Sequence, residues 1–348
     1  MHATPAPAPQ ARRRGLTTII VVVVLALAGL TAAGTALYRE LYSPAAFVER
    51  YLHLLAEHRA ADALRVPGVA LSREQLAALD LAHAPSDALL RQDALGTLSD
   101  INASQVSQSD DVYAVQAYYR AEGKAGQMSF RVVQDGWIGV VPRWRFAESP
   151  LAVLNVVVRG SDQLAVNGFS FDRRQVAADG VESAPLTPVP MLVFAPGSYT
   201  VSVDTQLSSA EGVTIRADAA QVVTQVDVQT QPSDELVAIV QERVDAFLQE
   251  CAAQRVLQPT ACPFGFHVDN RIVTEPAWEI ARYPAVALAP SGAGWQIPAT
   301  DASAHLTVRV QSIFDGTVST LSEDVPFAIK GTVTTLPDGT LSVRVSSP

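Results

Sequence analysis

The sequence contains few of the residue types on which metal, redox and nucleic-acid chemistry depend. Its 348 residues include two cysteines and six histidines, and 35 acidic residues outnumber 25 Lys and Arg residues, for a net charge of −10. No basic stripe with interleaved aromatic residues is present. An acidic chain of this kind is a poor partner for a phosphate backbone, so nucleic acid is excluded as a partner.

Signatures of the common enzyme classes are also missing. The sequence has no G-x-S-x-G, no P-loop, no G-x-G-x-x-G and no H-E-x-x-H. His53, Glu57 and His58 form H-x-x-x-E-H, which is one residue longer than the H-x-x-E-H zinc motif. On a helix the extra residue rotates the first His by about 100°, so the two His side chains no longer face one zinc ion. We therefore predict a non-enzymatic protein with no catalytic residues, no metal site and no cofactor.

Residues 16–38, LTTIIVVVVLALAGLTAAGTALY, lack charge altogether. As a helix this run would be about 34 Å long, which is enough to cross a bilayer core of roughly 30 Å. Arg12, Arg13 and Arg14 precede it, so the positive-inside rule places the N-terminus in the cytoplasm. We expect a disordered cytoplasmic tail over 1–15, a single transmembrane helix in the plasma membrane over 16–38, and an extracytoplasmic chain after about residue 38.

Two alternatives exist for this segment. A cleavable signal peptide would use Gly34-Thr35-Ala36 as its cleavage site, and residues 13–16 resemble part of a twin-arginine signal. Both alternatives would still export the C-terminal part. Because residues 1–40 carry four Arg and one Glu, the rest of the chain has a net charge of −13, which disfavours anionic polymers and lipids as electrostatic partners.

Hydrophobic periodicity divides the exported part into three blocks. In the first, residues 43–148, apolar residues follow Ser43 at three- and four-residue steps, which predicts a helix with Ser43 as its N-cap. A second helix from Ser72 and a third over 86–95 are expected. The pattern then alternates, which predicts antiparallel strands with a hairpin at Asp135-Gly136.

The second block, residues 150–230, has no helical period and predicts a small β-sandwich with turns at Asn167-Gly168 and Pro196-Gly197. The third block, residues 233–348, begins with a helix capped by Ser233 and continues as strands. The predicted fold class is α+β: an N-terminal transmembrane helix, a helix with a curved antiparallel sheet, an all-β sandwich, and a second helix-plus-sheet domain.

These blocks resemble known families. The helix-then-strand order of residues 43–148, closed by the aromatic strand Trp137 to Phe146, resembles the cone-shaped nuclear-transport-factor-like and ketosteroid-isomerase-like superfamily. The sandwich block is similar to the bacterial PEGA-type surface repeat, through Val166, Asn167, Gly168, Pro196, Gly197, Tyr199 and Val201. The whole layout resembles Gram-positive, single-pass envelope proteins of the teicoplanin-resistance-associated type, and the Ala/Val-rich composition suits an actinobacterium.

The cone resemblance implies a pocket between helix and sheet, which enzymes of that superfamily use for acid–base chemistry with Asp and Tyr. Four residues on or near the predicted strands are candidates to line it: Asp100, Tyr113, Tyr118 and Tyr119. Aromatic residues on strands more often belong to the core or to cross-strand pairs. A small-ligand-binding protein or an enzyme that uses this pocket is therefore the alternative function.

Cys251 and Cys262 are separated by a stretch that contains Pro259, at which a helix would end. His267 and His305 could join them in a zinc site, but the cysteine spacing is much longer than such sites use. In an oxidising compartment a disulfide is favoured over free thiols. We expect a structural disulfide that links helix to sheet.

These features together indicate a membrane-anchored, extracytoplasmic protein of the cell envelope. Its expected partners are the membrane, through one helix, and a cell-wall component or an envelope protein bound by the exported domains.

Overall fold

The computed structural model describes residues 40–79, 81–336 and 340–347, together with residues 22, 23, 25 and 38. The predicted tail over 1–15, with Arg12, Arg13 and Arg14, lies outside the described residues, as does most of the run 16–38. No helix in the described part of the chain is long and apolar enough to cross a membrane. That part has an α+β fold made mostly of strands, and it forms two compact units.

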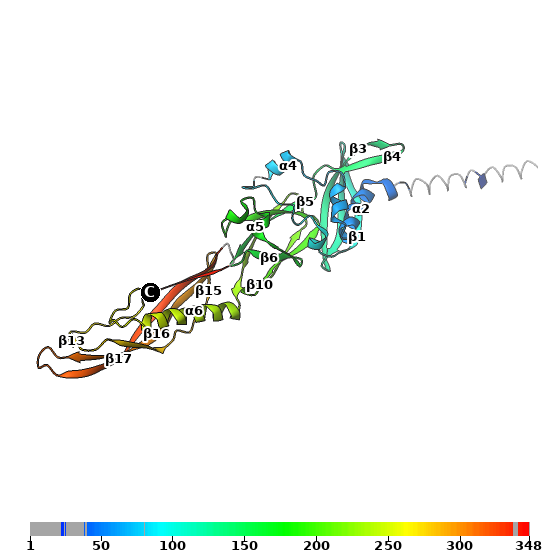
Figure 1. Ribbon diagram of the computed structural model, residues 1–348. Helices are drawn as coiled ribbons and strands as arrows, with labels where there is room; N and C mark the ends of the chain where they lie inside the picture. Colours follow the sequence, from blue (N-terminus) through cyan, green and yellow to red (C-terminus); the bar gives the residue numbers. More distant parts are fainter. Residues whose placement is uncertain are drawn as a thin grey trace, which may run out of the picture. The chain divides into compact units, whose positions relative to one another are not determined.

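The first unit contains the described residues up to Ala70 together with Leu98–Pro150. Its antiparallel sheet has the order β1-β2-β3-β4 and curls into a half-barrel round one helix (Figure 1). The bounds of its elements are α2 (Pro44–Ala56), α3 (Ala60–Arg65), β1 (Leu98–Ser109), β2 (Val112–Ala121), β3 (Lys124–Ile138) and β4 (Val141–Phe146).

The helix begins where the sequence predicts it. The Ser43 side chain accepts a hydrogen bond from the Ala46 backbone N–H, and Pro44 occupies the first helical position, where its missing N–H costs nothing. Tyr51 on the buried face of α2 packs edge-on against Phe130 of β3 and Phe146 of β4. This aromatic cluster forms part of the buried core between α2 and the sheet.

The hairpin predicted at Asp135-Gly136 is wrong. Strand β3 continues through Gly136 to Ile138, and a register shift between Gln134 and Trp137 marks a bulge there. The chain turns four residues later, at Gly139 and Val140, where Ile138 pairs with Val141. Gly136 has a φ of +84°, which a bulge accommodates as readily as a hairpin turn does.

The second unit contains residues Leu71–Thr97 and Leu151–Pro348. Helix α4 (Arg73–Ala78) begins with the predicted capping box between Ser72 and Gln75. The third helix predicted over 86–95 is wrong, apart from the short 3₁₀ turn η1 (Gln92–Ala94). Ser86 instead exchanges backbone hydrogen bonds with strand β8 (Val189–Phe194), accepting from Leu192 at 2.8 Å and donating to Pro190 at 2.9 Å.

Two small sheets follow. In the order β11-β5-β8, the three-stranded sheet contains β11 (Val223–Gln229), β5 (Leu151–Arg159) and β8 (Val189–Phe194), with β11 parallel to β5. In the order β12-β10-β9-β6-β7, the five-stranded sheet contains β12 (Gln231–Pro232), β10 (Ser208–Ala217), β9 (Gly197–Asp204), β6 (Gln163–Val166) and β7 (Phe169–Asp172). Asn167-Gly168 forms the predicted two-residue turn between β6 and β7.

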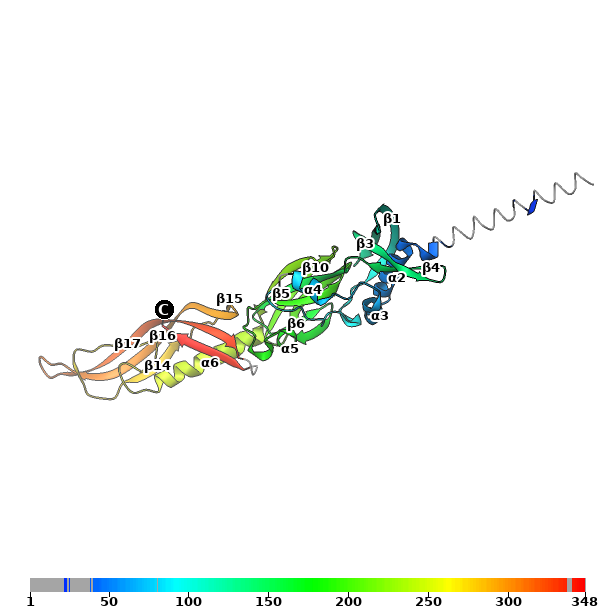
Figure 2. The ribbon, with the colours of Figure 1, turned by 90° about the horizontal axis from the view of Figure 1, so that it is seen from above.

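The C-terminal part places α6 (Asp234–Ala252) along an antiparallel sheet whose long strands are β16 (Gly294–Gln311) and β17 (Val318–Thr335) (Figure 2). The other strands are β13 (Arg271–Ile272), β14 (Ala277–Arg282), β15 (Ala289–Ser291) and β18 (Leu341–Ser346). Ser233 caps α6 as predicted, and the helix buries Leu236, Val240, Val244, Leu248 and Cys251 against the sheet.

Candidate functional site

The four residues predicted to line a pocket in the first unit do not converge. Asp100 is exposed and pairs with Arg120 at 3.1 Å. Tyr118 is half-exposed whereas Tyr119 is buried, because successive residues of β2 point to opposite faces of the sheet. Tyr113 packs edge-on against Trp144, with ring centroids 5.0 Å apart.

A cavity of about 350 Å³ does lie between α2 and the β3–β4 hairpin, lined by other residues. Its walls are mostly apolar and include Phe47, Ile138 and Trp144, while Arg50 and Arg143 supply its charge. None of its lining residues is Asp, Glu or His. Because a guanidinium stays protonated, neither arginine suits proton transfer, and the hydroxyls of Tyr42 and Tyr51 are the remaining acid–base groups in its lining.

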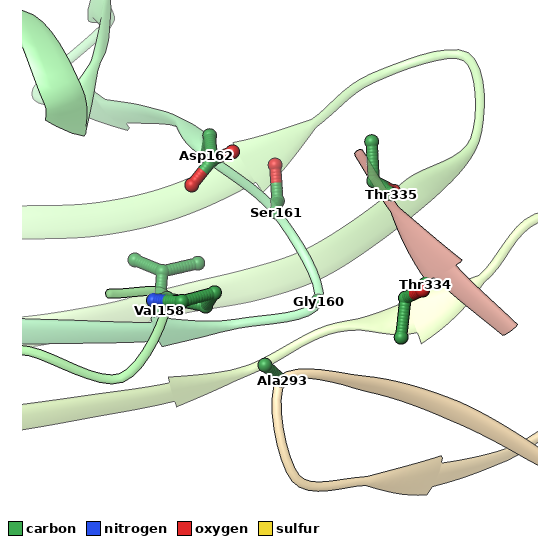
Figure 3. A pocket seen from close by; sticks show the side chains of 8 residues that line it. Val158, Gly160, Ser161, Asp162, Ala293, Thr334 and Thr335 are labelled. Carbon is green, nitrogen blue, oxygen red and sulfur yellow. The ribbon is translucent and has the colours of Figure 1, made fainter. Parts of the chain in front are cut away.

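In the second unit, the loop Gly160-Ser161-Asp162 separates two cavities, which together we call the polar cleft. The smaller, about 80 Å³, has Thr334 and Thr335 on its other side (Figure 3). The larger, about 290 Å³, is lined by polar and apolar side chains: Gln163, Arg174, Thr205, Gln206, Leu207, Ser208, Trp295 and Leu336. Sequence reasoning did not identify this site, because its walls come from segments more than 100 residues apart.

Four charged residues beside the polar cleft neutralise one another. Asp162 pairs with Arg173 at 2.8 Å and with Arg174 at 3.5 Å, and Asp172 pairs with Arg174 at 2.6 Å. Arg173 is almost fully buried, which a guanidinium tolerates only when it is paired. Burial acts to raise the pKa of Asp172, but hydrogen bonds from the side chain and backbone of Arg174 outweigh it and lower that pKa.

Trp295 forms the back wall of the larger cavity. Its side chain is 2% exposed, and its Nε1–H has no hydrogen-bond partner among the described residues. Gly160 packs against this indole with a φ of +90°, and a Cβ at Gly160 would collide with Thr230 Oγ1 and lie 2.9 Å from Trp295 Cζ2. The polar cleft is therefore lined by a tightly packed loop, and the Nε1 atom of the adjacent indole is buried out of reach of solvent.

A Ser-His-Asp arrangement occurs on the C-terminal sheet. His305 Nδ1 lies 2.6 Å from Asp324 Oδ1, and His305 Nε2 lies 2.9 Å from Ser322 Oγ. These contacts match those of a catalytic triad. Acyl transfer also requires a substrate pocket and donors for the oxyanion, yet these three side chains stand on the outward face of the sheet and border neither cavity of the polar cleft.

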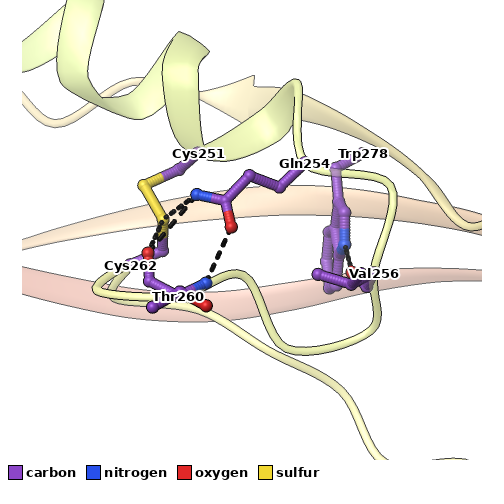
Figure 4. Close-up of a disulfide and its surroundings, with 6 residues drawn as sticks. All are labelled: Cys251, Gln254, Val256, Thr260, Cys262 and Trp278. Atoms are coloured by element: carbon purple, nitrogen blue, oxygen red, sulfur yellow. Dashed lines mark hydrogen bonds between the residues drawn. A yellow bond between two sulfur atoms is a disulfide. The ribbon is translucent and has the colours of Figure 1, made fainter.

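The structure joins Cys251 and Cys262 in a disulfide, as predicted, with the Cα atoms 5.7 Å apart (Figure 4). Gln254 secures the loop between them, because its Oε1 accepts from Thr260 N–H at 2.8 Å. Trp278 Nε1 also donates to Val256 O at 2.8 Å. The disulfide therefore ties the loop after α6 back to the end of the helix, and the Trp278 hydrogen bond ties that loop to β14 of the sheet.

The other candidate metal ligands do not gather in the described part of the chain. There, no group of three or more His, Cys, Asp or Glu residues has the arrangement to hold a metal ion. His267 is exposed beside Asp269, and His53 is exposed on α2.

Comparison with known proteins gave no match: no protein-family model, no curated protein and no solved structure is similar to this chain.

Proposed function

We propose that this chain is a membrane-anchored, extracytoplasmic protein of the cell envelope that binds a wall component or another envelope protein without catalysing a reaction. The anchor and its orientation rest on the uncharged run 16–38 and on Arg12, Arg13 and Arg14. The disulfide between Cys251 and Cys262 carries the proposal furthest, because disulfides form and persist in oxidising compartments.

The polar cleft supports an uncharged, polar ligand. Its nearby charges pair within the protein, so an anionic ligand would have to compete with Asp162 and Asp172 for the arginines, and a cationic ligand with the arginines for these carboxylates. Ser161 and Gln206 provide the hydroxyl and amide groups of the cleft, and these groups bond to Gln163 and Glu235 of the protein. Wall glycan, with its hydroxyl and amide groups, matches this chemistry better than an anionic wall polymer, which the acidic exported part would repel.

The cavity of the first unit supports the alternative, a small-ligand-binding protein. Its apolar walls, with Arg50 and Arg143, suit a ligand that has an apolar body and an anionic end. This cavity and the polar cleft lie in different units, so substitutions distinguish between them.

Topology and binding are tested separately. Full-length protein in cell membranes should resist alkaline carbonate extraction, and protease added from outside should degrade it beyond residue 38. In a pull-down with insoluble wall glycan stripped of anionic polymers, the wild type should be retained. The variant Q206W places a large side chain in the polar cleft, and the glycan should not retain it.

The matched control is Q105W, at an exposed position on β1 in the first unit, which should be retained as well as the wild type. Equal retention of Q206W and the wild type would exclude the polar cleft as the glycan site. Failure of the wild type to bind would exclude glycan, and crosslinking in intact cells would then be needed to identify an envelope protein as partner.

A further inference from the structure

Exposed apolar side chains gather at the β3–β4 turn of the first unit. Residues 136–142, GWIGVVP, carry no charge, and Trp137, Ile138 and Val140 are 61%, 67% and 78% exposed. Tyr38 and Leu41 add two more exposed apolar side chains from the segment before α2. Single exposed apolar residues are ordinary on a soluble protein, but a contiguous group marks an interaction surface. We call these five residues the apolar tip.

Two hydrogen bonds hold the turn against the segment that leads into α2. The Tyr38 hydroxyl donates to Val140 O at 2.6 Å, and Trp144 Nε1 donates to Tyr42 O at 2.8 Å. The rings of Tyr38 and Tyr42 also contact each other, with centroids 5.2 Å apart. The position of the turn relative to Tyr38 is therefore set by specific contacts.

Tyr38 determines the depth at which the apolar tip meets a membrane. It is the last residue of the uncharged run 16–38, whose helical length of about 34 Å slightly exceeds a bilayer core of roughly 30 Å. The end of such a run falls in the interfacial layer, where Tyr and Trp are enriched. Because Val140 is hydrogen-bonded to Tyr38, the turn must lie at this level as well.

We propose that the apolar tip inserts into the outer interfacial layer of the lipid bilayer, beside the anchor, as a second point of membrane attachment. This inference rests on the proposed function, since it requires the run 16–38 to be the anchor. A bilayer is favoured over a protein as the occupant, because lipid surrounds a transmembrane anchor and the apolar tip lies next to the end of that anchor at Tyr38. With two attachments, the first unit cannot rotate freely about its anchor.

The backbone and the flanking charges are compatible with this placement. Trp137 pairs with Pro142 and Ile138 with Val141 in the hairpin, and the Val140 carbonyl accepts a hydrogen bond from the Tyr38 hydroxyl. The flanking charged residues in the sequence are Arg39, Glu40, Asp135 and Arg143, which lie outside the uncharged stretch 136–142. Arg143 has a long side chain that reaches toward phosphate while its stem stays in the interface.

Tryptophan fluorescence tests the proposal in full-length protein reconstituted into phosphatidylcholine vesicles, with and without a bromine-labelled lipid. Of the four tryptophans, Trp144, Trp278 and Trp295 are buried and Trp137 is exposed. The brominated lipid should quench and the bilayer should blue-shift the wild-type emission. W137F should lose both effects, and circular dichroism should confirm that this variant is folded.

The matched control is the double variant W137F/Y118W. Tyr118 is half-exposed and pairs with Gln127, about 30 Å along β3 from Trp137 at roughly 3.3 Å per residue. A tryptophan at this position should not be quenched by the brominated lipid.

Carbonate extraction separates the possible failures. Suppose that the protein resists extraction. Equal quenching of the wild type and W137F would then overturn the tip proposal, as would strong quenching of W137F/Y118W, and the anchor would remain supported. Release of the protein by carbonate would overturn both the tip and the proposed function. If Trp137 in native membranes is shielded from acrylamide but not quenched by brominated lipid, it contacts a protein, and the bilayer proposal is wrong.

Discussion

His305 and Asp324 face each other across β16 and β17, and the imidazole joins the carboxylate to Ser322 on the outward face of the sheet. The strand register brings these three residues together: Asp324 is directly opposite His305, and Ser322 lies two residues away on the same face. Two antiparallel strands can thus reproduce the hydrogen bonds of a hydrolase triad away from the polar cleft.

The first prediction concerns this arrangement. Wild type and S322A should hydrolyse p-nitrophenyl acetate at the same background rate, because no cavity of the polar cleft borders Ser322 to hold a substrate. A fluorophosphonate probe should label neither protein. Wild-type turnover tenfold above that of S322A would refute the non-enzymatic proposal.

The second prediction concerns the disulfide. Replacing both cysteines, in C251S/C262S, should lower the free energy of unfolding by about 3 kcal/mol, because the closed loop no longer restricts the unfolded chain. Urea denaturation measures the loss, and non-reducing peptide mapping of the wild type should show the linked peptide. The reduced wild type serves as the control and should lose stability by a similar amount. Unchanged midpoints would mean that the bond does not stabilise the fold.

The third prediction separates steric contact from backbone strain. Gly160 and Gly168 have similar φ values, +90° and +86°, but only at Gly160 would a Cβ meet other atoms, namely those of Thr230 and Trp295. G168A should cost about 1 kcal/mol from strain alone. G160A should cost about 2 kcal/mol more, because the loop must move away from the indole. Similar losses in thermal unfolding of the two variants would show that the loop is not tightly packed.

The fourth prediction is a pH dependence. Because the folded-state pKa of Asp172 lies below its unfolded value of about 3.9, its stabilising effect is complete above that value and is lost as pH falls through the folded pKa. D172N should be less stable than the wild type by about 2 kcal/mol at pH 7, since it breaks a mostly buried ion pair with Arg174. The unfolding free energies of the wild type and D172N, measured at several pH values, should converge as the pH falls below about 4.

The control for this pH dependence is D227N. Asp227 pairs with Arg159 at 2.7 Å, but its side chain is more than half exposed. Its loss should cost less than about 1 kcal/mol, because water and salt screen an exposed pair. A pH-independent difference between wild type and D172N would show that the Asp172–Arg174 pair is not the source of stability.

Several features of the fold follow from neighbouring residues and were predictable. The caps at Ser43, Ser72 and Ser233 are examples, because a side-chain oxygen and the N–H group that it accepts from are only three residues apart. The turn at Asn167-Gly168 and the buried stripe of α6 belong to the same class. In each case the interaction that decides the structure lies within one or two turns of chain.

The incorrect predictions failed because distant segments decided the outcome. Residues 86–95 have a sequence compatible with a helix, but Ser86 finds its backbone partners at Pro190 and Leu192, about 100 residues away. The Asp135-Gly136 pair has the composition of a hairpin turn, but the register of β3 with β4 makes Gly136 part of a bulge. Local preferences of these short stretches are weak compared with the hydrogen bonds of a neighbouring strand.

The sequence by itself determined the uncharged run before Tyr38, the helix starts, the α+β order of elements and the cysteine pair, because each depends on local periodicity, capping or composition. Only the tertiary structure decided which side chains meet: Tyr38 with Val140, Gly160 with Trp295, and Asp162 with Arg173. Both the polar cleft and the apolar tip consist of such meetings. Strand register and loop packing create them, and neither can be read from a stretch of neighbouring residues.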